Sequence, residues 1–84
     1  MPFWVYILRS ETNGRYYCGH TSDITRRIQQ HNNPTYSATR TTKRFTGPWK
    51  LFWSKELLSR SEAMLLEKKI KKRGIARFLE ELSR

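Results

Sequence analysis

Residues 3–27, FWVYILRSETNGRYYCGHTSDITRR, predict two paired strands followed by a helix. Alternation along the first strand separates two sets of residues, with Phe3, Val5 and Ile7 on one face and Trp4, Tyr6 and Leu8 on the other. Because both sets are apolar, we expect this strand to be covered on both faces. Asn13-Gly14 favours a hairpin turn of two residues or more, after which residues 15–20 return as an antiparallel strand.

Residues 21–32, TSDITRRIQQHN, have the pattern of a helix. Thr21 or Ser22 can cap its start, and isoleucines four residues apart mark its buried side. Arg27 and His31 share the same spacing beside that buried side, so both side chains can reach over the sheet.

The rest of the chain supplies a third strand and two helices. Residues 49–57 have the pattern of a strand with Trp49, Leu51 and Trp53 on one face and Phe52 on the other. A capping box, Ser59 to Glu62, begins a helix over residues 59–73, which Gly74 ends, and residues 75–84 form a short final helix. We therefore predict one α+β domain over residues 1–84, a three-stranded, mainly antiparallel sheet flanked by helices in the order β-β-α-β-α-α.

The composition favours a nucleic-acid partner. Seventeen Lys and Arg against seven Asp and Glu give a net charge of +10, and three Trp, four Tyr and four Phe accompany them. Basic, aromatic-rich small domains bind phosphates and stack on bases, although basic surfaces also meet membranes and acidic proteins. The sequence contains no apolar run of about 20 residues and no signal-peptide pattern, so we expect a cytoplasmic protein without a membrane partner.

The lone cysteine, Cys18, excludes a disulfide framework and reads as a small apolar side chain. A zinc site formed with His20 and His31 is an alternative, but the three residues lack a regular metal spacing. Six of the seven carboxylates lie in a turn, at a helix start, at a strand end or in the last turns of the chain, and Glu67 is the seventh. If Glu67 has only a structural role, that role is an ion pair with Lys71, four residues later.

The combined pattern resembles the GIY-YIG nuclease superfamily. Trp4-Val5-Tyr6 and Tyr17-Cys18-Gly19 stand where the two signature tripeptides fall, and Asp23, Ile24, Arg27 and His31 follow at the family's spacing. The segment SEAMLLEKKIKK, residues 61–72, is similar to the helix of small stand-alone members that carries the conserved glutamate, which places that glutamate at Glu67. Trp4 and Cys18 depart from the signature's first glycine and second isoleucine.

The resemblance implies a divalent-metal-dependent endonuclease that hydrolyses phosphodiester bonds of nucleic acid, with DNA favoured over RNA. Tyr17 would be the general base, Arg27 would clamp the phosphate, Glu67 would hold one Mg²⁺ or Mn²⁺ ion, and Tyr6 and His31 would hydrogen-bond around that centre. The expected nucleic-acid track comprises His20, Arg26, Tyr36, Arg40, Lys43 and Arg44. Family members act in repair, restriction and mobile elements, and without an appended DNA-binding domain a protein partner would supply target specificity.

Two other functions fit parts of the pattern. The fold and charge suit a basic nucleic-acid-binding module with little or no catalytic activity. A protein-binding module with an incidental basic face would leave Tyr17, Arg27 and Glu67 unexplained.

Overall fold

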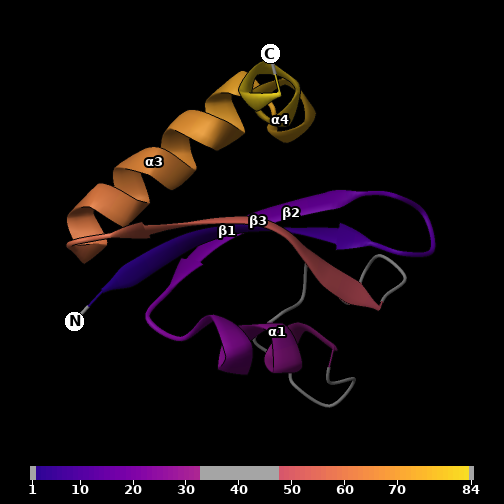
Figure 1. Cartoon of the computed structure of the whole chain (residues 1–84), viewed down its shortest axis with the longest axis horizontal. Coiled ribbons are helices and arrows are strands. Elements are labelled where there is room, and N and C mark those ends of the chain that lie inside the picture. The colour runs from indigo at the N-terminus through magenta and orange to yellow at the C-terminus, as the bar shows by residue number, and fades with distance from the viewer. Residues whose placement is uncertain (1, 33–47, 84) are drawn as a thin grey trace.

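A computed structural model describes residues 2–32 and 48–83 (Figure 1). Its strands are β1 (Phe3–Ser10), β2 (Tyr16–Thr21) and β3 (Trp49–Leu57), and its helices are α1 (Ile24–Asn32), α3 (Arg60–Arg73) and α4 (Ile75–Leu82). The strands pair antiparallel in the spatial order β2-β1-β3. The predicted α+β class and the order β-β-α-β-α-α are confirmed over these residues.

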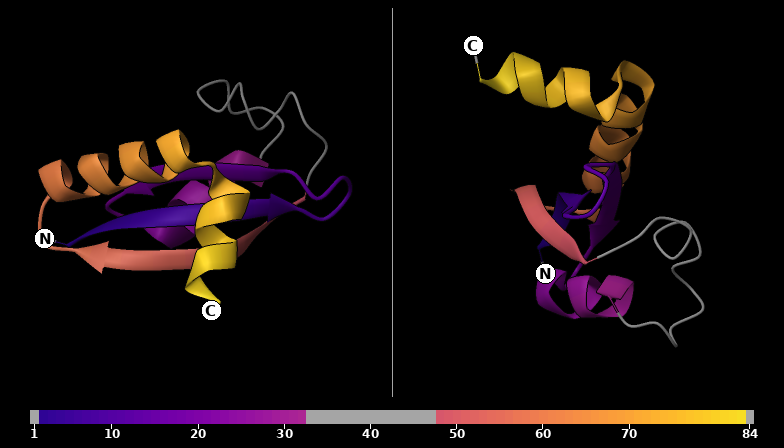
Figure 2. Two further views of the ribbon diagram at one scale, coloured as in Figure 1. Left: turned by 90° about the horizontal axis from the view of Figure 1, so that it is seen from above. Right: turned by 90° about the vertical axis from the view of Figure 1, so that its right-hand side faces the viewer.

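The sheet is the middle of three layers, with α1 on one face and α3 and α4 on the other (Figures 1 and 2). Val5 and Ile7 are fully buried in the cluster on the α3 side, whereas Tyr6 and Leu8 are buried in the cluster on the α1 side. The expectation that β1 is covered on both faces is therefore confirmed. None of the helices in these two described ranges has the length and hydropathy needed to cross a membrane.

The β1–β2 hairpin uses a turn longer than two residues. The Ser10 amide donates to the Arg15 carbonyl at 2.8 Å, and the Gly14 amide donates to the Ser10 carbonyl at 3.0 Å. Gly14 has a φ of 73°, which explains why glycine occupies this position. The predicted turn is confirmed, and its length is settled.

Strand β3 contains a bulge that corrects one expectation. Trp53 pairs with Ile7 and Leu51 pairs with Leu8, which leaves Phe52 without a partner on β1. The extra residue reverses the alternation of side chains along the strand. Trp53 consequently packs on the α3 side while Trp49 is buried on the α1 side, so the prediction that they share a face is wrong.

The helix ends follow capping chemistry. Helix α1 is capped by Asp23, whose Oδ1 accepts from the Arg26 amide at 3.1 Å, and not by Thr21 or Ser22 as predicted. Thr21 Oγ1 instead accepts from the Asp23 amide at 3.1 Å, so it holds the capping residue in place. The Ser59 cap of α3 is confirmed by a 3.2 Å bond from the Glu62 amide, and Gly74 ends that helix with a φ of 98°.

Candidate active site

Tyr6 and His31 form a buried pair between the sheet and α1. The Tyr6 hydroxyl lies 2.9 Å from His31 Nε2, and the two residues are 1% and 3% exposed. Burial raises the Tyr6 pKa well above its usual value, against a smaller lowering by the nearby Arg27. Burial, together with the Arg27 charge, lowers the His31 pKa to about 4. At neutral pH the protonated phenol of Tyr6 therefore faces the neutral imidazole of His31. This protonation state suits a positioning role for Tyr6 better than a role as general base.

Gly19 makes room for this pair. It is directly opposite Tyr6 across the β1–β2 ladder. A Cβ atom on Gly19 would lie 2.7 Å from the Tyr6 Oη, 2.9 Å from its Cζ and 3.1 Å from Tyr17 Cε2. Glycine suits this position because the ring of Tyr6 approaches the β2 backbone closely.

Tyr17 is on the same face of the sheet as Tyr6 but is less buried. Its ring centroid lies 4.7 Å from that of His31 and 6.3 Å from that of Tyr6. Because β2 is an edge strand, Tyr17 stands where the sheet meets solvent. Of the two tyrosines, Tyr17 is the one whose hydroxyl a substrate can approach.

Arg27 is in the middle of α1, half-buried beside these rings. Its Nη1 donates to Gln30 Oε1 at 2.9 Å, and its guanidinium is close enough to Tyr6 and His31 to influence the pKa of both. Gln30 was not among the residues predicted for the site, since an amide three positions from an arginine has no distinguishing signal in the sequence.

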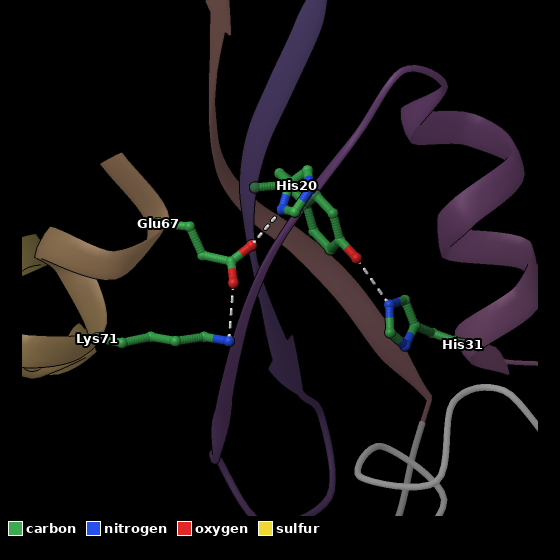
Figure 3. A network of polar contacts seen from close by, with 5 residues as sticks. His20, His31, Glu67 and Lys71 are labelled. Carbon is green, nitrogen blue, oxygen red and sulfur yellow. Dashed lines mark hydrogen bonds and ion pairs between the residues drawn. The ribbon is translucent and has the colours of Figure 1, made fainter. Parts of the chain in front are cut away.

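Glu67 belongs to the opposite layer. Its Oε1 lies 2.7 Å from His20 Nδ1 on β2, and its Oε2 lies 3.0 Å from Lys71 Nζ (Figure 3). The predicted ion pair with Lys71 is therefore present, together with a partner, His20, that is 47 residues away in the sequence. Burial tends to lower the Lys71 pKa, but the bond to Glu67 and its charge raise it overall.

The two layers meet at the edge of β2. Lys71 Nζ lies 5.9 Å from the centroid of the Tyr17 ring, although the two side chains come from opposite sides of the sheet. Lys71 thus connects Glu67 with Tyr17. The sequence showed Lys71 only as a helical neighbour of Glu67, because nothing in the spacing indicates its approach to Tyr17.

A surface hollow opens beside Glu67 and is lined by His20, Met64, Glu67, Lys68, Lys71 and Lys72. The side chain of Glu67 is 19% exposed, so solvent reaches its carboxylate. The described residues contain no cluster of three or more His, Cys, Asp or Glu side chains suited to a metal. One accessible carboxylate nevertheless fits Mg²⁺, which retains several waters and needs only one or two protein carboxylates.

Cys18 lies apart from this chemistry. It is buried against α3, and burial, with the Glu67 charge, raises the pKa of its thiol to about 12. The reading of Cys18 as an apolar side chain fits this environment, and no zinc-like cluster joins it to His20 and His31 within the described ranges.

The structure describes only part of the predicted nucleic-acid track. Arg26 is exposed on α1, and His20 is half-buried against Glu67. Tyr36, Arg40, Lys43 and Arg44 lie outside the described residues.

Comparison with known proteins bears directly on this constellation. The model of the GIY-YIG catalytic domain matches residues 2–77, which span both tyrosines, Arg27, His31 and Glu67. The chain belongs to the GIY-YIG family. The fold is also similar to that in a solution NMR structure of a UPF0213 protein from Bacillus halodurans. That protein is 30% identical, with a TM-score of 0.58, and the match covers 99% of this chain and 84% of that one.

Two curated relatives are UPF0213 proteins from Vibrio cholerae, one from each of two serotype O1 strains. Each is 37% identical over 71 residues, which is 83% of this chain and 66% of the relative. The chain thus spans slightly less than two thirds of the length of these relatives.

Proposed function

We propose that this GIY-YIG protein is a divalent-metal-dependent endonuclease that hydrolyses phosphodiester bonds, with DNA favoured over RNA. The observation that carries the proposal is the meeting of Tyr17 and Glu67 at the β2 edge, where Lys71 lies 3.0 Å from the carboxylate and 5.9 Å from the ring centroid. Hydrolysis of a phosphodiester requires a base, an anionic metal ligand and cations around one point that solvent can reach.

In the proposed mechanism, Tyr17 orients the attacking water and accepts its proton. Arg27 contacts the non-bridging phosphate oxygens, where its planar fork and permanent charge stabilise the charge that develops. Tyr6 and His31 hold the neighbourhood of Tyr17 in place through their 2.9 Å bond.

Glu67 would hold the metal ion, with His20 orienting its carboxylate through the 2.7 Å contact. A bound Mg²⁺ or Mn²⁺ ion would supply Lewis-acid polarisation of the phosphate and stabilise the leaving oxygen. Each carboxylate oxygen has two acceptor positions, so the contacts with His20 and Lys71 leave capacity for a cation.

The proposed partner is nucleic acid, bound through the excess of cationic side chains, and a protein partner would supply target specificity. Track residues Arg26 and His20, and those between residues 36 and 44, remain predictions, as does a cytoplasmic location.

The test is cleavage of single-stranded, duplex and branched DNA with Mg²⁺ or Mn²⁺. Glu67→Gln should abolish cleavage, because it removes the anionic ligand while keeping the side chain's size. Glu56→Gln is a matched control, since it removes the same charge from an exposed carboxylate on β3. Cleavage that persists in Glu67→Gln would refute the assigned metal ligand.

A second pair of variants tests the phosphate clamp. Arg27→Lys keeps the charge but loses the bidentate fork, and it should slow cleavage by about 10²-fold or more, as for loss of one transition-state donor. Arg60→Lys, at the exposed start of α3 and outside the predicted track, should cut like the wild type. Equal rates for both variants would remove Arg27 from the mechanism.

One observation favours the alternative of a binding module without activity. Both oxygens of Glu67 already have cationic or hydrogen-bonding partners, His20 and Lys71, which can serve to fasten α3 to the sheet. Binding of DNA with a steep salt dependence, but no cleavage with any divalent metal, would establish this alternative.

A further inference from the structure

A second cluster of cationic and aromatic side chains lies at the hairpin end of the sheet. The Arg9 guanidinium carbon is 5.8 Å from the centroid of the Tyr16 ring and 6.0 Å from that of Phe52. The two rings meet edge to face, with centroids 5.6 Å apart. These three residues, one from each strand, form what we call the hairpin-end cluster.

The bulge in β3 accounts for the position of Phe52. It is the residue without a partner on β1, and the irregularity turns its side chain toward Tyr16 and not into the core. Phe52 is 50% exposed, a large fraction for an aromatic side chain within a strand. Bulges commonly redirect side chains beside functional sites.

Helices α3 and α4 leave Arg9 and Phe52 of this cluster exposed. The hairpin extends past α3 and α4 in Figure 1 and in the left view of Figure 2. An open hollow of about 620 Å³ adjoins the cluster, and it is lined by Arg9, the turn residues Ser10–Gly14, and Lys50, Leu51 and Phe52. A ligand the size of a nucleobase can therefore reach the Phe52 ring.

The surrounding charge is suited to an anion. Arg9 is exposed and makes no ion pair with any carboxylate in residues 2–32 or 48–83. Lys50 pairs with Glu11 at 3.1 Å, but its side chain is 75% exposed, so that pair is weak and can exchange for a phosphate. Exposed rings bordered by cations are the arrangement with which proteins bind single strands, through base stacking and contacts with the backbone.

We propose that the hairpin-end cluster is a stacking site for an unpaired base of single-stranded nucleic acid. The base stacks on Phe52, while Arg9 and Lys50 contact the adjoining phosphates. This inference rests on the proposed function, since it assumes a nucleic-acid substrate, and it adds a preference for substrates that contain a single-stranded segment.

The distance to the candidate active site sets the expected spacing. Tyr16 and His20 are on the same face of β2, four residues apart, which is about 13 Å along a strand. Stacked bases rise about 3.4 Å each, so about four nucleotides separate the stacked base from the phosphate near Glu67.

The experiment measures binding without cleavage, in EDTA, to a single-stranded 12-nucleotide DNA carrying 2-aminopurine and to a blunt duplex of equal length. Phe52→Ala should weaken single-strand binding about 5- to 150-fold, the range for the loss of one base–aromatic stack. Duplex binding should change less than about twofold. Phe52→Trp should restore binding, whereas Phe52→Leu, which keeps apolar volume without a ring, should not.

Leu65→Ala is the control, because Leu65 is a 69% exposed apolar side chain on α3 that does not line the hollow beside the cluster. An equal loss for Leu65→Ala and Phe52→Ala, equal losses on both DNAs, or full binding by Phe52→Leu would overturn the stacking site. If the wild type cuts DNA while Phe52→Ala binds single strands normally, only the stacking site fails. If the wild type binds neither DNA at low salt, the proposed function and the stacking site fail together.

Discussion

Adding one methyl group at Gly19 should destabilise the fold and disturb the Tyr6–His31 pair. In Gly19→Ala the new Cβ would lie 2.7 Å from the Tyr6 Oη and 2.9 Å from Cζ, both inside van der Waals contact. Tyr6 cannot swing away easily, because it is 1% exposed and its hydroxyl is bonded to His31 at 2.9 Å.

The cost follows from these contacts. Overpacking of a buried site costs about 1–3 kcal/mol. Displacing the Tyr6 ring also loses its hydrogen bond to His31, worth about 1 kcal/mol. We therefore expect Gly19→Ala to lower the free energy of unfolding by about 2–4 kcal/mol, which for a domain of this size lowers the Tm by at least about 8 °C.

The assay is urea and thermal unfolding followed by circular dichroism, with a double-mutant cycle as the control. Tyr6→Phe removes the oxygen that makes the closest contact, so the added methyl should cost less in the Tyr6→Phe background, by about 1 kcal/mol. A Gly19→Ala protein within about 0.5 kcal/mol of the wild type would refute the reasoning. So would strict additivity with Tyr6→Phe.

Three further outcomes follow from the described contacts. The His31 pKa of about 4 is lower than the unfolded value near 6.5, so the unfolded chain takes up a proton first as pH falls; the free energy of unfolding should decrease between about pH 7 and pH 4, by up to about 3 kcal/mol. Urea titrations at several pH values should find a shallower slope in His31→Gln, and an unchanged slope would contradict this assignment. Cys18, buried with a pKa of about 12, should react with a thiol reagent only after unfolding, so rapid labelling of the native protein would be inconsistent with the structure. Ser59→Ala should cost about 1 kcal/mol in urea unfolding because it removes the cap of α3, whereas Ser22→Ala should cost little, since Ser22 is exposed and Asp23 caps α1.

The local chemistry of the chain was readable from its sequence. Asn13-Gly14 marked the hairpin, Ser59 and Gly74 marked the ends of α3, and alternation separated the two faces of β1. Each of these signals acts between residues close in the chain, where backbone conformation follows from side-chain type.

The errors and omissions involve contacts that local patterns do not encode. The Trp53 prediction failed because an alternating pattern cannot show a bulge, which depends on the register with β1. The contact between His20 and Glu67 depends on where α3 crosses β2. Asp23, Thr21 and Ser22 are all competent caps, and only the backbone path chooses among them.

The division of the candidate site between two layers has a consequence for protein synthesis. Once the chain has been synthesised as far as Asn32, it contains Tyr6, Tyr17, Arg27 and His31. Glu67 follows 35 positions after Asn32, on the helix of the opposite layer. Under the proposed function, a nascent or truncated chain therefore carries the base and the clamp without the metal ligand. On the same proposal, the cell's own nucleic acids would meet a complete catalyst only once helices cover both faces of the sheet.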